Sequence, residues 1–386
     1  MKKYAFFFPV DKDLSLTGGP RTVINLLTGL QSVGHETVLL SQRESALTEE
    51  LRKQGVQVEV VELPDLLDVH DEKALEYSLP QKASSLSQLI RYNWRIAACC
   101  QRHDVDRLWA RDIKGVLLVG FAAQYLGVPL IWDMGYEKPS KGLVRILHWI
   151  GFLLTTRVIT QAERQFPQTF SLLVQKLFGH KVGHIYPGID PDRQVALQKA
   201  GENQKGNGRT VLTIANIHPR KNQKMTIQAL SPLLQSIPDL RLVFAGAVRD
   251  QNYYEELRAI VNNEGIEESV RFLGWRDDIP ALLADSDLLV LSSLREGIPH
   301  VVREAMFAQV PVVATRVGGV PESVRHGETG YLVNADDQSS FREHAEDLIR
   351  DSEKRKKMGQ NALQFGQERF SHSAWIKTYS GVLEAD

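Results

Sequence analysis

The sequence has little cysteine, no long apolar run and almost no excess of charge of either sign. Its two cysteines, Cys99 and Cys100, are adjacent in a chain of 386 residues, which excludes a disulfide scaffold and indicates a reducing compartment. No stretch approaches the roughly 18 apolar residues of a membrane span. The 46 lysines and arginines balance 47 acids, so composition gives no general attraction to nucleic acid. We therefore expect a cytoplasmic protein with no nucleic-acid partner.

Short apolar runs alternate with helical patterns along the chain, which is long enough for two domains. This alternation predicts parallel, doubly wound sheets. We expect an α/β fold of two Rossmann-like domains, over 1–188 and 189–370, that face a cleft. The expected strands lie at 4–9, 37–41, 107–110, 129–132, 210–215, 240–245, 270–273, 287–293, 310–314 and 330–333.

Two glutamates follow the expected strand at 287–293. Glu296 lies in the loop after this strand, and Glu304 lies about a turn and a half into the next helix. Ligands bind at the carboxyl edge of open parallel sheets. A carboxylate there can hold sugar hydroxyls while free amides at a helix start face a phosphate. Surface charges on an amphipathic helix and a glycosidase-like acid pair are the alternatives.

Two adjacent cations, Arg220 and Lys221, follow the first strand of the second half. An arginine fork and a lysine point charge suit a diphosphate, although a solvated pair of charges is an equal alternative. Gly18 and Gly19 follow the first strand of the chain, where a helix start favours an anion. A plain turn explains these glycines equally well. Because the segment is not G-x-G-x-x-G, it does not indicate dinucleotide binding.

Three further features have competing interpretations. Glu322 is expected to be a first-turn helix carboxylate. Asp133 or Glu137, after a first-half strand, could orient an acceptor hydroxyl or be a loop charge. The basic amphipathic stretch 138–157 could contact an anionic membrane at its inner face, but packing against the first domain is favoured.

Several segments, taken in order, resemble retaining glycosyltransferases of the GT-B fold, family 4 or "group 1". The resemblance runs nearly end to end and is strongest over 210–333, where the glutamates with seven intervening residues match the family's signature. It implies transfer of a hexosyl group from a nucleoside-diphosphate sugar to a glycan, lipid-linked or small-molecule acceptor. Such transfer would need neither a metal nor a cofactor, and would serve cell-surface polysaccharide or glycoconjugate synthesis. The segments are GGPRTVINLLTGLQSVGHETVLL, VDRLWARD, YPGID, VRFLGW, ADSDLLVLSSLREGIPHVVREAMFAQVPVVATRVGGVPESV and HGETGYLV.

The resemblance also implies roles for individual residues. Glu296 and Lys221 would be catalytic, with Glu296 on the donor sugar and Glu304 on the ribose. The last helix, within 371–386, would cross back onto the first domain. The remaining donor contacts would be the amides around Gly297 and Ile298 at the diphosphate, Leu273 and Gly274 by the base, and Gly18 and Gly19 over the phosphates.

The chain departs from the family pattern in three places. Asn216 stands where an arginine is common, and Arg220 could supply the missing charge. A histidine usual after the first-domain strand is absent from 132–137, and Pro299 lacks an amide beside the presumed phosphate. Two alternative functions therefore stay open: a GT-B nucleotide-sugar 2-epimerase, and a non-catalytic subunit that binds a nucleotide sugar.

Overall fold

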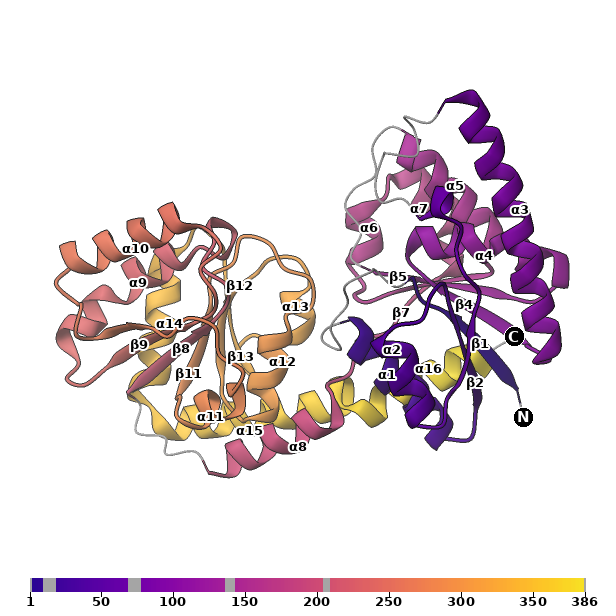
Figure 1. Ribbon diagram of the computed structural model, residues 1–386. Helices are drawn as coiled ribbons and strands as arrows, with labels where there is room; N and C mark the ends of the chain where they lie inside the picture. The colour runs from indigo at the N-terminus through magenta and orange to yellow at the C-terminus, as the bar shows by residue number, and fades with distance from the viewer. Residues whose placement is uncertain (1, 10–18, 69–77, 136–142, 204–208, 385–386) are drawn as a thin grey trace. The chain divides into compact units, whose positions relative to one another are not determined.

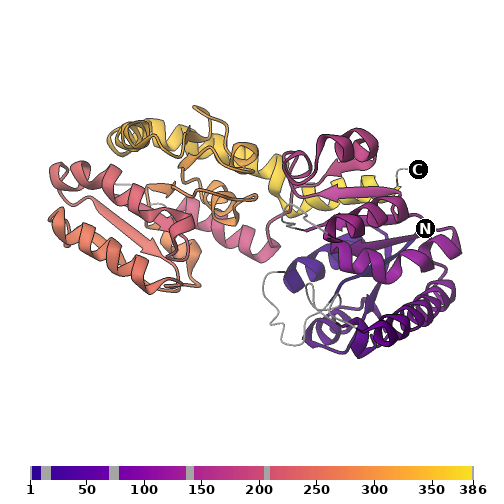
Figure 2. The ribbon, with the colours of Figure 1, turned by 90° about the horizontal axis from the view of Figure 1, so that it is seen from above.

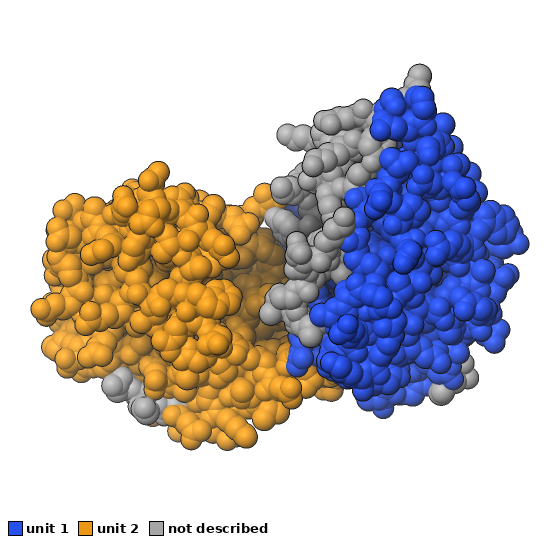
Figure 3. All heavy atoms as spheres, viewed as in Figure 1, with its two compact units in different colours: residues 1–185, 376–386 blue, residues 186–375 orange. Residues whose placement is uncertain are grey.

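The computed structural model describes residues 2–9, 19–68, 78–135, 143–203 and 209–384. The chain divides into two compact units (Figure 3). Unit 1 is Met1–Ile185 with Ile376–Asp386, and unit 2 is Tyr186–Trp375. Each unit is built on one parallel sheet with helices on both faces (Figure 1, Figure 2). No helix in the described ranges is long and apolar enough to cross a bilayer.

The sheet of unit 1 has seven strands in the order β3-β2-β1-β4-β5-β6-β7. The order reverses beside β1, and crossovers are right-handed, so α1 and α2 cover one face and α3, α4 and α5 the other. The strands are β1 (Lys3–Phe7), β2 (Glu36–Ser41), β3 (Gln57–Val60), β4 (Arg107–Arg111), β5 (Leu130–Met134), β6 (Arg157–Thr160) and β7 (Val182–His184). The helices are α1 (Gly19–Ser32), α2 (Ala46–Lys53), α3 (Leu79–Arg102), α4 (Asp112–Leu126), α5 (Leu143–Leu154), α6 (Gln165–Thr169) and α7 (Leu172–Phe178), with short η1 (Asp65–Leu67) and η3 (Gly179–Lys181).

Unit 2 repeats this pattern with six strands in the order β10-β9-β8-β11-β12-β13. Both sheets confirm the predicted α/β class of parallel, doubly wound sheets. The strands are β8 (Thr210–Ile214), β9 (Arg241–Ala245), β10 (Val270–Phe272), β11 (Leu288–Leu291), β12 (Val312–Thr315) and β13 (Gly330–Val333). The helices are α8 (Pro191–Glu202), η4 (Pro219–Lys221), α9 (Gln223–Ser236), α10 (Gln251–Asn263), α11 (Ile279–Ala284), α12 (His300–Phe307), α13 (Val320–Ser323), α14 (Gln338–Arg350) and α15 (Ser352–Phe370). The last helix, α16 (His372–Glu384), begins in unit 2 and lies mostly in unit 1.

The longest helix, α3, falls largely in a polar stretch that the sequence analysis left unassigned. Its start has a recognisable signal, because the backbone N–H of Ser78 donates to Gln81 Oε1 at 2.9 Å in a capping arrangement. Tyr92, Ile96 and Cys99 follow at helical spacing and are fully buried. Serines in the first turns obscure this periodicity, which explains why the sequence indicated loop and helix over 62–92 without bounds for either.

The amphipathic stretch predicted over 138–157 corresponds to α5 from Leu143 onward, while 138–142 lies outside the described residues. One side of α5 packs within unit 1. His148 and Phe152 are buried, and the Trp149 ring contacts the Phe178 ring edge-on with 5.3 Å between centroids. The opposite side exposes Ile146 and Leu153. Packing therefore accounts for one face of the helix only.

Asp133 differs from the expectation that it presents a carboxylate to an acceptor. Its side chain in β5 is 2% exposed. Arg111 Nη1 lies 3.3 Å from Asp133 Oδ2, and the Tyr379 hydroxyl of α16 donates to the same oxygen at 3.4 Å. Burial raises the pKa of Asp133 while Arg111 opposes the rise. The carboxylate thus joins β4, β5 and the part of α16 that belongs to unit 1. Glu137 lies outside the described residues.

Replacing this buried carboxylate tests its structural role. Asp133→Ala should lower the free energy of unfolding by about 3 kcal/mol, because it leaves the Arg111 guanidinium without its counter-ion. Urea denaturation measures the change. Glu62→Ala, at an exposed carboxylate of the same unit, is the control and should be nearly neutral. Equal stability of the two variants would contradict the assignment.

Candidate functional site

Unit 2 contains a pocket of about 570 Å³ at the carboxyl ends of its central strands. Its volume falls within the usual range for small-molecule sites. Residues from the segments after β8, β9, β10 and β11 line it, together with one side chain of α8. They are Arg193, Ile214, Ala215, Asn216, Arg220, Lys221, Ala245, Gly246, Trp275, Arg276, Asp277, Ile279, Glu296, Ile298, Pro299, His300, Val301 and Glu304.

The strand order explains the position of this pocket. The chain moves outward from β8 to β9 and β10, then returns to β11 on the other side of β8. The connections after β8 and β11 therefore diverge, and such a switch point opens a crevice at the carboxyl edge. The two connections also bind each other. Leu294 N donates to the Arg220 carbonyl at 2.9 Å, and the Ser292 hydroxyl donates to the Asn222 carbonyl at 2.8 Å.

The two residues predicted to be catalytic are in direct contact. Lys221 Nζ lies 2.6 Å from Glu296 Oε1, and the Ser293 hydroxyl donates to the same oxygen at 2.6 Å. The side chains of Lys221 and Glu296 are only 19% and 12% exposed. Partial burial strengthens their attraction relative to an exposed pair. One carboxylate oxygen is thus fixed by a cation and a hydroxyl at the pocket wall.

Glu304 has a cationic partner that the sequence analysis missed. Arg193 Nε, from the first turn of α8, lies 2.8 Å from Glu304 Oε1, and Arg193 Nη1 donates to the Asp277 carbonyl at 3.4 Å. The start of α8 is set by Asp190, whose side chain accepts from Arg193 N. The sequence motif YPGID gave a signal for the helix start but none for this pairing.

A buried cation supports the helix that carries Glu304. Arg303 is 1% exposed. Its Nη1 donates to the Gly188 carbonyl at 3.1 Å, and its Nη2 lies 2.7 Å from His300 Nδ1. The Arg303 charge, with burial, lowers the pKa of His300 to about 3. His300 is consequently neutral at ordinary pH, so Nδ1 accepts this hydrogen bond and its ring lines the pocket without charge.

Two glycines let the connection after β12 pack against the Glu296 loop. Gly318 has φ of +52°, and a Cβ added there would lie 1.8 Å from the Glu296 carbonyl oxygen. A Cβ on Gly319 would lie 2.8 Å from the Gly297 carbonyl oxygen. Glu322 lies in the first turn of α13, as expected, and accepts a hydrogen bond from the Tyr186 hydroxyl at 3.0 Å.

Of the other residues predicted to contact the sugar donor, only some line the pocket. Asn216 lines the pocket, and its Oδ1 accepts from Ala247 N at 3.2 Å. Ile298 lines the pocket and Gly297 does not. Leu273 and Gly274 do not line it either, but the next two residues along the chain, Trp275 and Arg276, do. Gly274 lies close by, since its carbonyl accepts from Gly246 N at 2.7 Å. Gly18 is outside the described residues, and Gly19 begins α1 in unit 1.

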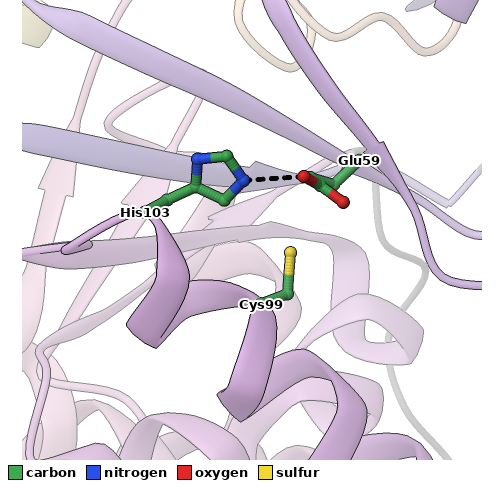
Figure 4. Close-up of side chains that lie close together, drawn as sticks. All are labelled: Glu59, Cys99 and His103. Atoms are coloured by element: carbon green, nitrogen blue, oxygen red, sulfur yellow. Dashed lines mark hydrogen bonds and ion pairs between the residues drawn. The ribbon is translucent and has the colours of Figure 1, made fainter.

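A separate cluster in unit 1 gathers Glu59, Cys99 and His103 (Figure 4). His103 Nε2 lies 2.8 Å from Glu59 Oε1. Burial, assisted by the Glu59 charge, raises the pKa of Cys99 to about 11. The thiol therefore stays protonated and Glu59 already has a partner, which makes a hydrogen-bonded cluster a sufficient description. The expectation that the protein holds no metal stays a prediction.

Comparison with known proteins identifies the family. The model for glycosyl transferases group 1 matches residues 195–365. A GDP-mannose-dependent alpha-(1-6)-phosphatidylinositol monomannoside mannosyltransferase from Mycolicibacterium smegmatis is 31% identical over 283 residues, which are 67% of this chain and 70% of that protein. This chain belongs to the glycosyl transferases group 1.

Two further relatives match over shorter segments. The N-acetyl-alpha-D-glucosaminyl L-malate synthase of Bacillus anthracis is 33% identical over 172 residues. The putative glycosyltransferase EpsD of Bacillus subtilis is 37% identical over 176 residues. Each alignment covers 45% of this chain, and the chain spans less than half of either relative, 44% and 45% of their lengths.

Solved structures support the fold of this chain. Anabaena HepE in complex with UDP matches with a TM-score of 0.74 and 21% identity, covering 99% of both chains. A glycosyltransferase from Rickettsia africae gives a TM-score of 0.76 at 17% identity, covering 100% of this chain and 99% of that one. Two Rossmann-like parallel-sheet domains, the architecture of GT-B glycosyltransferases, are thereby confirmed.

The close approach at Gly318 should make it less replaceable than other glycines. Gly318→Ala should destabilise unit 2 by more than about 2 kcal/mol, because left-handed strain adds to the clash with Glu296. Gly327→Ala is the matched control: its φ is +82° but nothing lies within 4 Å of the added Cβ, so it should cost about 1 kcal/mol. Thermal and chemical unfolding compare the two. A smaller loss at Gly318 would show that the loops are not packed as described.

Proposed function

We propose that this glycosyltransferase moves a hexosyl group from a nucleoside-diphosphate sugar to an acceptor hydroxyl with retention, in cell-surface polysaccharide or glycoconjugate synthesis. The names of relatives support this choice. They include the GDP-mannose-dependent mannosyltransferase, a lipopolysaccharide core glycosyltransferase LpsE of Rhizobium meliloti at 28% identity, and HepE bound to UDP and glucose. The resemblance to retaining enzymes supports the stereochemistry.

The observation that carries the proposal is the contact between Lys221 and Glu296 in one pocket, with 2.6 Å between Nζ and Oε1. A sugar nucleotide joins a hydroxyl-rich ring to a diphosphate through one anomeric bond. A carboxylate beside an ammonium matches that junction, since Glu296 can accept from sugar hydroxyls while Lys221 faces the adjacent phosphate. Arg220 is exposed on the same pocket and supplies the second cation.

The remaining donor contacts follow from the pocket wall. Glu304, oriented by Arg193, is assigned to the ribose hydroxyls, because carboxylate oxygens accept from vicinal hydroxyls. The base is assigned to the segment 273–276, where Trp275 is 72% exposed and offers a ring for stacking. The family commonly has an arginine at the position of Asn216, which has no charge. Arg220 is assigned the role of that arginine.

The chemical step needs stabilisation of charge on the departing diphosphate. Lys221 and Arg220 lie where that charge develops, and fixed cations of this kind can contribute several kcal/mol. The sugar becomes oxocarbenium-like as the bond breaks, and the Glu296 carboxylate offsets that positive charge. Glu296 is not assigned as a nucleophile. Its role is to orient the sugar.

Changing the carboxylate to an amide tests this role. Glu296→Gln should reduce transfer by about 100-fold with little change in folding, because the shape is kept while the charge that offsets the oxocarbenium is lost. Glu328→Gln, at an exposed carboxylate of unit 2, is the control. Sugar transfer to acceptor is measured with a donor chosen by screening nucleotide sugars for thermal stabilisation. Near-parental turnover of Glu296→Gln would refute the assignment.

The same assay separates the alternatives. An altered free sugar formed without acceptor would indicate a nucleotide-sugar 2-epimerase. Tight donor binding with no product under any acceptor would indicate a binding subunit. Nuclear magnetic resonance of the new glycosidic bond reports its anomeric configuration, and inversion would exclude the retaining mechanism.

We also propose that catalysis needs no metal or other cofactor, because Lys221 and Arg220 provide the cationic groups that face the diphosphate. Transfer should therefore be unchanged after treatment with EDTA and dialysis. Lys221→Ala, in contrast, should lower turnover by about 100-fold with or without added Mg²⁺. Loss of activity in EDTA that is restored by Mg²⁺ would contradict this prediction.

A further inference from the structure

Unit 1 exposes a row of large apolar side chains on two neighbouring helices. Leu86, Ile90 and Trp94 of α3 recur every four residues and are 58%, 51% and 54% exposed. Side chains at this spacing lie along one side of a helix. On α4, Phe121 and Tyr125 are 53% and 61% exposed. The Trp94 and Tyr125 rings touch, with centroids 4.5 Å apart. We call these five residues the α3–α4 apolar face.

The helices leave a shallow apolar groove between them of about 240 Å³. Its polar lining residue, Asn93, is already engaged, since its Oδ1 accepts from Ala122 N at 2.9 Å. The groove therefore offers aliphatic and aromatic surface. A contiguous exposed patch of this kind marks an interaction site rather than ordinary surface. It is lined by Ile90, Asn93, Trp94, Ala97, Phe121, Ala122 and Tyr125.

The helices around this face carry mainly positive charge, although Glu59 of β3 pairs with Arg102 and Asp68 pairs with Lys114. The sequence of α3 contains no aspartate or glutamate. Together α3, α4 and α5 have a single acidic residue, Asp112, in the first turn of α4. The chain as a whole has 46 cationic and 47 acidic residues, so these helices are locally cationic within a nearly neutral protein. Their lysines and arginines are Lys82, Arg91, Arg95, Arg102, Lys114 and Arg145.

We propose that the α3–α4 apolar face docks on an anionic phospholipid bilayer. Tryptophan and tyrosine suit the boundary between head groups and acyl chains, because each combines an apolar ring with a polar group. Arg91 and Arg95 are exposed, and flanking cations of this type attract anionic lipid. The neighbouring helix α5, which packs beside α4, also exposes Ile146 and Leu153. The proposal places the membrane contact first considered for 138–157 mainly on α3 and α4.

Charge favours this occupant over a second copy of the chain. A two-fold interface brings the same patch of both subunits together. The arginines of α3 would then approach each other without carboxylates on the same helix to pair with them, and like charges across an interface are unfavourable. A surface of phosphate head groups has the complementary sign.

The experiment uses the whole chain in flotation with two vesicle types, phosphatidylcholine alone and phosphatidylcholine with phosphatidylglycerol. Binding should require phosphatidylglycerol and weaken with added salt. Arg91→Glu with Arg95→Glu should lower partitioning by at least about tenfold. Trp94→Ser should lower it by removing an inserted ring. Lys356→Glu with Lys357→Glu, on exposed positions of α15 in unit 2, changes the charge equally and should bind like the parent.

Thermal unfolding of each variant verifies that it is folded. Failure of the parent to float with phosphatidylglycerol vesicles would overturn the proposal, and so would unchanged binding by the Arg91 and Arg95 double variant. A dimer detected by light scattering and abolished by Trp94→Ser, without vesicle binding, would assign the face to self-association instead. Sugar transfer to a water-soluble acceptor is assayed in parallel, so failure of membrane docking is distinguishable from failure of the proposed activity.

Discussion

The ion pair between Lys221 and Glu296 is the contact on which the proposed site depends. Each charge is mostly buried, and a buried charge is tolerated only when it is paired. In this pocket the two side chains meet this need for each other. A diphosphate would offer Lys221 a new counter-ion, and sugar hydroxyls would offer Glu296 new donors. Ligand binding would thus exchange one set of charge partners for another without leaving either group unpaired.

This exchange needs the two loops to hold their positions, and the structure shows how the sequence achieves that. The Thr226 hydroxyl donates to Ser292 Oγ at 2.7 Å, and the Thr315 hydroxyl donates to the Ser293 carbonyl. These small hydroxyl residues join α9, β11 and β12 beneath the pocket. Gly318 then permits a third loop to approach Glu296 closely. The carboxylate is therefore positioned by packing from three connections and not by its own loop alone.

The sequence was informative where local pattern decides structure. The run 287–293 contains β11, and the strand expected at 240–245 contains β9. Contacts between distant residues could not be read from it. Arg193 pairs with Glu304 across 111 positions, and Tyr379 reaches Asp133 across 246. Pairs of this kind leave no periodic pattern in the sequence. Asp133 looked like an exposed residue at a strand end because the helix that covers it comes from the other end of the chain.

The even balance of charge in the whole chain conceals two local arrangements. In unit 2, two cations of the pocket are each paired with a carboxylate: Lys221 with Glu296, and Arg193 with Glu304. In unit 1, α3 has cations and no carboxylate of its own, beside exposed apolar rings. Paired charges suit a site that must hold a small anionic ligand and release it. An unbalanced cationic face suits a broad anionic surface, where many weak contacts act together. The near-zero net charge excludes neither arrangement, because local distribution decides which partner each surface attracts.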